Sequence, residues 1–197
     1  PAPDLEATIH FTYKGIGIPL GAIHTYEHYA RGVDAMGRFF GPGPEHTFLC
    51  ALPLSHIYAL NGCVLVPLCA GGATAIVRTG KPQQMLRFAQ THRANVLCLV
   101  PPLYRLLAMC ARRAKEVDLS GTHWISGGSH LTAALYEDLE REFRVRPMQG
   151  YGLTEALIVT ASNLEWNRPG TLGVPLFSGT QVLVLSKDRR ELPRGEA

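Results

Sequence analysis

A glycine-rich segment near the start of the chain has the composition of an anion-binding loop. Residues 12–21 form the sequence TYKGIGIPLG, which holds three glycines, one lysine and one threonine. Glycine lets backbone N–H groups converge on an anion, and lysine adds a point charge. The segment is not a Walker loop, because no Gly-Lys-Ser or Gly-Lys-Thr sequence opens a helix there. Its composition fits an ordinary turn as well as a phosphate site.

Two further glycine-rich turns are expected at the ends of apolar strands. Ser126-Gly127-Gly128-Ser129 follows one strand, and residues 149–155 (QGYGLTE) follow the next. Glycine at these points lets a flat ring approach the backbone, Tyr151 offers a stacking face and Thr154 offers a hydroxyl group for a phosphate. Glu155 supplies a hard carboxylate of the kind that binds Mg²⁺. The combination predicts a site for a nucleoside triphosphate.

The order of the expected elements explains how these turns meet. A strand-loop-strand unit is expected over residues 8–25, followed by a helix that Thr25 caps and that the block 41–44 (GPGP) ends. From residue 47 to residue 149, strands and helices alternate, which predicts an α/β fold with doubly wound, mostly parallel sheets. Ligands of such sheets bind at the carboxyl ends of the strands, where both turns fall.

We expect these elements at definite positions. The predicted strands are 47–52, 73–78, 95–100, 123–126 and 145–149. One predicted helix begins near residue 56, and three further helices are predicted over 82–92, 102–114 and 132–143. A last strand over 180–185, with a turn at 187–189, predicts a small antiparallel β element at the C-terminus.

Composition and charge exclude several classes of protein. Of the 197 residues, 46% are hydrophobic, which is typical of a globular protein and excludes disorder. The 19 Lys and Arg against 16 Asp and Glu are scattered, so no nucleic-acid surface is expected. The most apolar stretch, residues 63–77, is broken by Pro67 and Gly71-Gly72, so no transmembrane segment is expected. Five cysteines without Cys-x-x-Cys pairs favour buried, reduced thiols and a cytoplasmic location.

Together with four further segments, the two turns resemble motifs of the adenylate-forming (AMP-binding) superfamily, in particular its acyl-CoA synthetases. Residues 151–155 (YGLTE) are similar to the family's Y-G-x-T-E motif, and residues 126–128 are similar to its S-G-G segment. The other similar segments are PLSHIY (53–58), VPP (100–102), PGTLGVP (169–175) and ELPRGE (191–196). The resemblance runs from about Ile9 to the last residue and implies a central fragment of the family's large N-terminal domain.

This resemblance implies the ATP-dependent activation of a carboxylic acid. The carboxylate attacks the α-phosphate, pyrophosphate leaves, and CoA then takes the acyl group from the acyl-adenylate. By position, Glu155 would bind Mg²⁺ and Thr154 the α-phosphate, with His56 as the third catalytic residue. The residues implied to bind ATP are Thr12, Tyr13, Lys14, Gly15, Gly17, Gly127, Gly128, Ser129, Gln149, Gly150, Tyr151 and Gly152.

The loop at residues 12–21 departs from the family's pattern, T-S-G-T-T-G-x-P-K-G. Gly15 and Ile16 replace two hydroxyl residues, and Leu20 replaces the lysine. The loss of hydroxyl donors can weaken such a site. One hypothesis is that Lys14 supplies the missing charge, and the rival hypothesis is a weakened or retired phosphate site.

The segment that begins at His56 indicates the kind of acid. Amino-acid-activating members usually carry an acidic residue at this motif position, which pairs with the ammonium group of the substrate, and an imidazole cannot replace it. We therefore expect a fatty or aryl acid. The expected acyl pocket consists of His56, Ile57, Tyr58, Leu60 and Gly62. His24 and His28 are spaced as metal ligands on a helix can be, but without a third ligand nearby we expect both to be exposed.

The expected organisation has three parts. Residues 1–120 would carry the phosphate loop and the acyl pocket, residues 121–177 the adenine-binding βαβ segment, and residues 178–197 the start of a truncated β element. The family's later elements would lie beyond Ala197, so this piece alone is expected to be inactive. Two alternatives to a CoA ligase stay open: a loading domain that passes the acyl group to a carrier protein, and a catalytically retired nucleotide-binding module.

Overall fold

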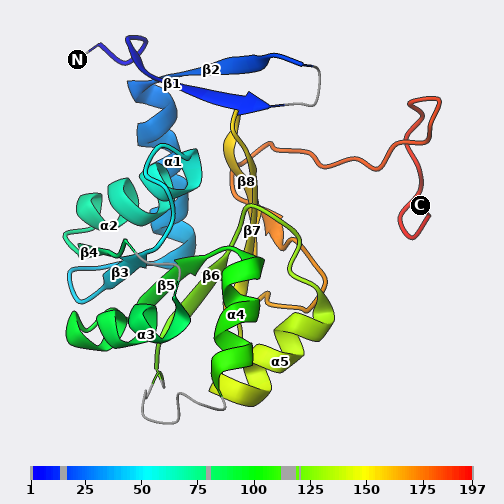
Figure 1. Ribbon diagram of the computed structural model, residues 1–197. Helices are drawn as coiled ribbons and strands as arrows, with labels where there is room; N and C mark the ends of the chain where they lie inside the picture. Colours follow the sequence, from blue (N-terminus) through cyan, green and yellow to red (C-terminus); the bar gives the residue numbers. More distant parts are fainter. Residues whose placement is uncertain (1, 14–16, 79–80, 112–118, 120, 197) are drawn as a thin grey trace.

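A seven-stranded sheet forms the centre of the molecule (Figure 1). The computed structural model describes residues 2–13, 17–78, 81–111, 119 and 121–196. In the sheet order β4-β3-β5-β6-β7-β8-β9, the first five strands run parallel, and β8 and β9 are antiparallel. The strands are β3 (Thr47–Cys50), β4 (Ala73–Ile76), β5 (Val96–Leu99), β6 (His123–Ser126), β7 (Met148–Leu153), β8 (Leu157–Ala161) and β9 (Val174–Pro175). The predicted α/β class with a mostly parallel sheet is confirmed.

Helices cover both faces of this sheet because its strands are apolar on both sides. The helices are α1 (Tyr26–Phe40), the π-helix η1 (Tyr58–Leu65), α2 (Val66–Cys69), α3 (Pro82–Thr91), α4 (Pro101–Ala111) and α5 (Ala133–Phe143). Leu97 and Leu99 of β5 belong to the core under α3, α4 and α5. Val96 and Cys98, which alternate with them, belong to the second core under α1 and η1. This period-two pattern separates the two cores.

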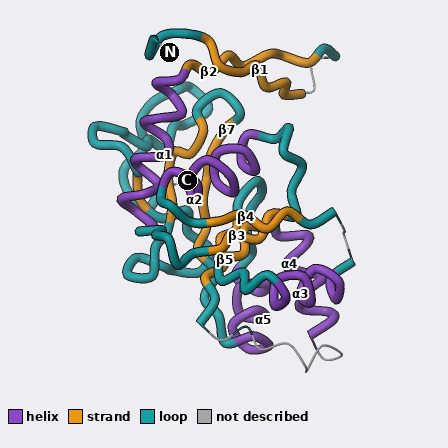
Figure 2. Tube along the Cα trace, turned by 90° about the vertical axis from the view of Figure 1, so that its left-hand side faces the viewer, coloured by secondary structure: helices purple, strands orange, loops and turns teal. Residues whose placement is uncertain are grey.

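Strands β1 (Glu6–Tyr13) and β2 (Pro19–Thr25) form a separate antiparallel hairpin. In both views the hairpin lies as a layer of its own at one end of the molecule, above α1 and β7 (Figures 1 and 2). Helix α1 follows directly, and its first turn is capped by the Thr25 side chain, which accepts a hydrogen bond from the His28 N–H at 3.3 Å. Gly41 ends the helix in the left-handed conformation with φ 59°. The strand-loop-strand unit and the helix after it are therefore confirmed.

Several expected elements differ from the structure. The strand expected at 145–149 starts at Met148 and continues to Leu153, and an antiparallel partner, β8, follows it. The helix expected from residue 56 opens as a π-helix. Residues 180–185 form no strand, but the turn expected at 187–189 is present, with a bridge between Leu185 and Glu191 and a hydrogen bond from the Leu192 N–H to the Val184 carbonyl at 2.8 Å. The alternating valines Val182 and Val184 of this tail are exposed.

The large sheet crosses the boundary expected near Gly121. Strand β5 pairs in parallel with β6, so strands on either side of that boundary share one sheet. The division of the chain into three parts stays a prediction. Cys50, Cys63 and Cys98 are buried as expected, whereas Cys69 is exposed because it ends the short helix α2 at the surface. Within the described residues, no helix has the length and apolar character needed to cross a bilayer.

Candidate functional site

A cavity of about 230 Å³ lies at the carboxyl ends of β6 and β7. The hairpin, η1 and the β7–β8 turn also line it. The predicted site residues that line this cavity are Thr12, His56, Ile57, Tyr58, Gly62, Gly127, Gly128, Gly150, Tyr151, Gly152 and Thr154. Parts of the chain up to about 140 residues apart therefore meet at the edge of the sheet where ligands bind.

Other predicted site residues do not line the cavity. These are Tyr13, Gly17, Leu60, Ser129, Gln149 and Glu155. Lys14 and Gly15 lie outside the described residues. Glu155 is exposed on the turn beside the half-buried Thr154. Gln149 is buried at the end of β7, and its side-chain amide donates a hydrogen bond to the Ser129 carbonyl at 3.1 Å. Through this bond Gln149 positions the loop at residues 127–129 and does not face the cavity itself.

The ring of Tyr58 forms the floor of the cavity. Its hydroxyl donates to the Ile125 carbonyl at 3.0 Å, which fixes the ring under the end of β6. A Cβ atom added to Gly127 would lie 3.1 Å from this ring, and one added to Gly62 would lie 3.2 Å from it. Both distances are shorter than a comfortable carbon–carbon contact. The glycines at these two positions therefore make room for the tyrosine.

The π-helical geometry of η1 determines which of its residues face the cavity. The N–H of Val66 donates to the Asn61 carbonyl five residues earlier, so each turn of this helix holds more residues than an α-turn. Leu60, expected in the acyl pocket, is half-buried elsewhere, and Asn61 lines the cavity in its place. A place for Leu60 in the acyl pocket stays a prediction. A single amide within an apolar run was the signal that pointed to Asn61.

A tight turn between β7 and β8 holds Thr154 and Glu155. The N–H of Ala156 donates to the Leu153 carbonyl at 3.1 Å, and Leu157 adopts a positive φ of 55°. A Cβ atom at Gly152 would lie 2.0 Å from the Leu157 carbonyl oxygen, so only glycine allows the strands to close here. This turn presents the Thr154 side chain at the mouth of the cavity.

Two buried polar atoms at the cavity have no hydrogen-bond partner within the described part of the chain. They are Asn61 Oδ1 and Ser126 Oγ, and both residues line the cavity. Buried polar groups are almost always paired, so these two atoms are exceptions within the described part of the chain. Ser126 was quoted as part of a motif but was not predicted as a contact. Its position at the last residue of a buried strand was the signal.

The histidines near the cavity fall into two environments. The Nδ1 atom of His56 accepts a hydrogen bond from the Tyr58 N–H at 3.1 Å, and partial burial together with the nearby His10 lowers the pKa of His56. His28 is exposed, as expected. His24 is not, because only 1% of its surface is accessible. The expectation of exposure fails since β2 places this side chain on the face of the hairpin that covers the β7–β8 turn.

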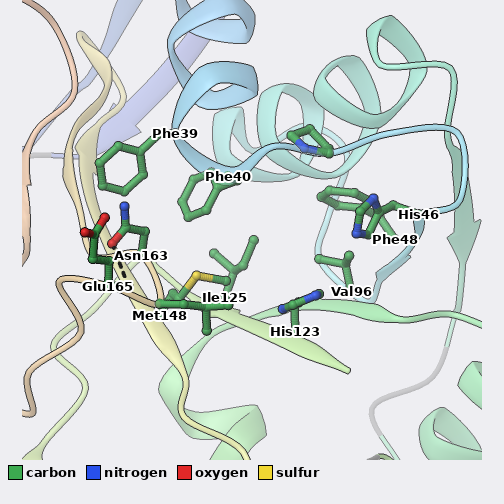
Figure 3. Close-up of a pocket in the computed structure, with 12 residues that line it drawn as sticks. Phe39, Phe40, His46, Phe48, Val96, His123, Ile125, Met148, Asn163 and Glu165 are labelled. Atoms are coloured by element: carbon green, nitrogen blue, oxygen red, sulfur yellow. Dashed lines mark hydrogen bonds between the residues drawn. The ribbon is translucent and has the colours of Figure 1, made fainter. Parts of the chain in front are cut away.

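A second cavity, of about 240 Å³, lies at the amino ends of the same strands (Figure 3). Phe39 and Phe40 of α1 form one wall, and Val96 and His123 begin the strands opposite. The ring centroids of His46 and His123 are 5.9 Å apart. None of the predicted site residues lines this cavity, and it lies at the end of the sheet where ligands rarely bind. The first cavity is therefore the candidate site.

The amino-acid sequence of this chain is similar to those of known CoA ligases. A 4-coumarate–CoA ligase from Pinus taeda is 28% identical over 208 residues, which cover 99% of this chain and 38% of that enzyme. A 4-coumarate–CoA ligase from Arabidopsis thaliana, number 3, is 31% identical over 183 residues, which cover 90% of this chain and 32% of that enzyme. The chain thus spans about a third of the length of the curated relatives it matches.

This chain is also similar in fold to solved structures. ATP-bound MatB from Rhodopseudomonas palustris superimposes with a TM-score of 0.89 and 26% identity, over 100% of this chain and 39% of that protein. The model of the AMP-binding enzyme family matches residues 6–197. Nearly the whole chain is included in this match, with the cavity and both glycine turns. The chain belongs to the family of AMP-binding enzymes.

Proposed function

We propose that this chain is part of an acid–thiol ligase that uses ATP to convert a carboxylic acid into an acyl-adenylate and then transfers the acyl group to CoA. One observation carries the proposal. Thr12 of the hairpin, the glycine turn after β6 and the Tyr151–Thr154 segment line one cavity, together with the apolar wall of η1. A nucleotide and a carboxylic acid that bind there would lie next to each other.

The reaction itself needs little covalent help from the protein. A carboxylate oxygen attacks the α-phosphorus, the bond to pyrophosphate breaks, and the new acyl-adenylate then loses AMP when the CoA sulfur attacks its carbonyl carbon. Positioning and charge stabilisation dominate such phosphoryl chemistry. In this proposal Tyr151 stacks on the adenine, the backbone at Gly127 and Gly128 approaches the nucleotide closely, and the Thr154 hydroxyl donates to the α-phosphate.

The donor set at the β7–β8 turn fits a magnesium ion. Glu155 offers an exposed carboxylate beside the Thr154 hydroxyl, and both are hard oxygen ligands of the kind that Mg²⁺ prefers. When bound, the ion would offset the negative charge of the phosphates. Glu155 would hold it from the protein side, while the phosphate oxygens supply further ligands.

The lining residues favour an acid without an amino group. Ile57, Tyr58 and Ile158 make one side of the cavity apolar, and no aspartate or glutamate is among the described residues that line it. The lowered pKa of His56 keeps this imidazole neutral near pH 7. The names of the relatives favour an aryl acid over a fatty acid. A cytoplasmic location stays part of the proposal, although one relative is named as peroxisomal.

ATP–pyrophosphate exchange by the full-length parent protein tests the proposal, with a panel of aryl, fatty and amino acids. We expect ATP–pyrophosphate exchange in the presence of aryl acids, and we expect acyl-CoA to form when CoA is added. Transfer only to a carrier protein would assign the loading reaction instead, and no exchange with any acid would favour a retired site.

A matched pair of variants assigns the role of Thr154. Thr154→Val removes only the hydroxyl group, and we expect it to slow exchange about 100-fold, the typical cost of a lost donor at a developing charge. Thr160→Val is the control, because the Thr160 hydroxyl is buried, has no partner among the described residues and does not line the cavity. Equal rates for the two variants would contradict the proposed role.

The unusual phosphate loop needs its own variant. Lys14→Ala should lower the exchange rate if this lysine supplies the charge that the loop otherwise lacks. An unchanged rate in an active parent protein would rule out compensation by Lys14.

A further inference from the structure

The imidazole of His24 makes a direct bond to the turn that carries Thr154 and Glu155. Its Nε2 atom lies 2.6 Å from the Thr154 carbonyl oxygen, 130 residues away in sequence. A carbonyl oxygen can only accept, so Nε2 must carry the hydrogen. Burial is the largest cause that lowers the pKa of His24, while the bond to Thr154 and the charge of Glu155 raise it and offset part of the shift. The neutral tautomer that makes the bond to Thr154 has its hydrogen on Nε2 and leaves Nδ1 as an acceptor.

That Nδ1 atom has no partner among the described residues. An unpaired buried acceptor lowers stability, so packing alone does not explain a histidine at this position. A leucine would fill similar space without the unpaired atom. The one hydrogen bond that the ring makes is the one to Thr154, and this is the contact that distinguishes histidine from an apolar residue.

A second histidine joins the same hairpin to the segment just before His56, which lines the cavity. The Nδ1 atom of His10 donates to the Ser55 carbonyl at 3.0 Å, next to His56. The Nε2 atom of His10 accepts from the Tyr29 hydroxyl at 2.9 Å, and that oxygen lies 2.7 Å from the Thr8 hydroxyl. The rings of His10 and His24 are 5.9 Å apart. The hairpin is thus bonded to two carbonyls, that of Thr154 in the β7–β8 turn and that of Ser55 beside His56.

The bond to Thr154 fixes a peptide that matters for the chemistry. The Thr154 carbonyl belongs to the peptide plane between Thr154 and Glu155, so its direction sets the orientation of both side chains. The turn is otherwise closed by the Ala156 N–H bond to Leu153. Catalytic groups must be placed to within a fraction of an ångström, and small misplacements cost much of the rate.

We propose that His24 is a positioning residue, which holds the Thr154–Glu155 peptide against the phosphate-loop hairpin through its Nε2–H bond to the Thr154 carbonyl. The proposal rests on the adenylation function proposed above. It deepens that function by naming the contact through which the two phosphate-binding segments are kept in register.

Three variants of the full-length parent protein test this role. His24→Leu removes the donor and the unpaired Nδ1 together, whereas His24→Gln keeps an N–H donor close to the position of Nε2. His92→Leu is the control, because His92 is exposed at the end of α3, contacts the Phe88 ring at a tilt of 42° and does not line the cavity. ATP–pyrophosphate exchange gives kcat and the KM for the acid, and hydrogen exchange at the Ala156 amide reports the turn directly.

We expect His24→Leu to lower kcat about 10-fold to 100-fold, the cost typical of a misplaced catalytic group, with little change in the KM for the acid and no loss of thermal stability. Hydrogen exchange at the Ala156 amide should become faster. His24→Gln should restore most of the kcat and most of the protection of this amide, and His92→Leu should resemble the wild type.

The outcomes separate the two proposals. An active wild type with unchanged kcat in His24→Leu would overturn the positioning role, and so would failure of His24→Gln to recover activity. An unchanged rate of hydrogen exchange at the Ala156 amide in His24→Leu would overturn the bond between His24 and the Thr154 carbonyl, whether or not the protein is active. A wild type without ATP–pyrophosphate exchange on any acid would overturn the proposed function and, with it, the positioning role of His24 in that reaction, while hydrogen exchange at the Ala156 amide would still test the bond.

Discussion

The contact between Gly127 and Tyr58 leads to a prediction at the scale of single residues. The Tyr58 ring cannot move away easily, because its hydroxyl is bonded to the Ile125 carbonyl and a Cβ at Gly127 would lie 3.1 Å from the ring. We expect Gly127→Ala to destabilise the protein by about 1–2 kcal/mol, as overpacking does, and to reduce exchange activity. Chemical unfolding and exchange assays would measure both, and a fully stable, fully active variant would contradict the proposed packing.

The histidines near the cavity predict how stability depends on pH, with the larger effect from His24, because His24 is buried whereas His56 is exposed. Burial is the main cause that lowers the pKa of both His24 and His56 below the ordinary value of 6.5. The unfolded chain then binds protons that the folded chain does not, so stability rises with pH in this range. The contribution of the two histidines to stability is complete above pH 6.5 and is lost as the pH falls through their folded-state pKa values. The melting temperature should fall between pH 7 and pH 5, and it should fall by less in His24→Leu. Equal slopes of melting temperature against pH in the two proteins would contradict this.

Individual site residues could be predicted where local chemistry decides their position. Gly127, Gly150, Tyr151 and Thr154 line the same cavity, because glycine turns after parallel strands converge at one edge of a sheet, and their roles stay predictions. The burial of His24 could not be predicted, since it depends on how a hairpin lies over a turn 130 residues away. Local spacing gives no sign of such a contact.

At the scale of elements, α1 offers a test of the helix assignment. Gly37 lies in the last turn of this helix, and a Cβ atom added there meets nothing within 4 Å. We expect Gly37→Ala to stabilise the protein by about 0.5–1 kcal/mol, the difference in helix propensity between the two residues. This variant is also a control for Gly127→Ala, because it is the same substitution without the clash. Destabilisation by Gly37→Ala would contradict the open surroundings.

The elements that the sequence did not predict share one physical cause. Residues 157–161 (LIVTA) form a short apolar run, which local periodicity cannot assign to a strand or to a helix. Only pairing with β7 decides in favour of β8. The π-helix η1 is similar, because an apolar segment rich in small residues gives no signal for a wider turn. In contrast, α1 has a threonine cap and a Gly-Pro stop, and both of its ends were predicted.

At the scale of the whole molecule, the described surface exposes two groups of apolar side chains. On the outer face of the hairpin, Ile9, Phe11 and Tyr13 are 55%, 74% and 67% exposed. Val182 and Val184 in the tail are 62% and 53% exposed. Apolar surface of this extent on a monomer usually belongs to an interface. The chain also spans only about a third of the length of the relatives it matches.

These surfaces predict the behaviour of the 197-residue chain on its own. We expect the purified chain to self-associate and to form no acyl-CoA from ATP, CoA and any aryl acid, because it spans only about a third of the length of the ligases it matches. Light scattering would measure association, and Phe11→Ser should reduce it without altering either core, since Phe11 is on the exposed face of the hairpin. Acyl-CoA formation by the isolated chain would show that the cavity described above already holds every group the reaction requires.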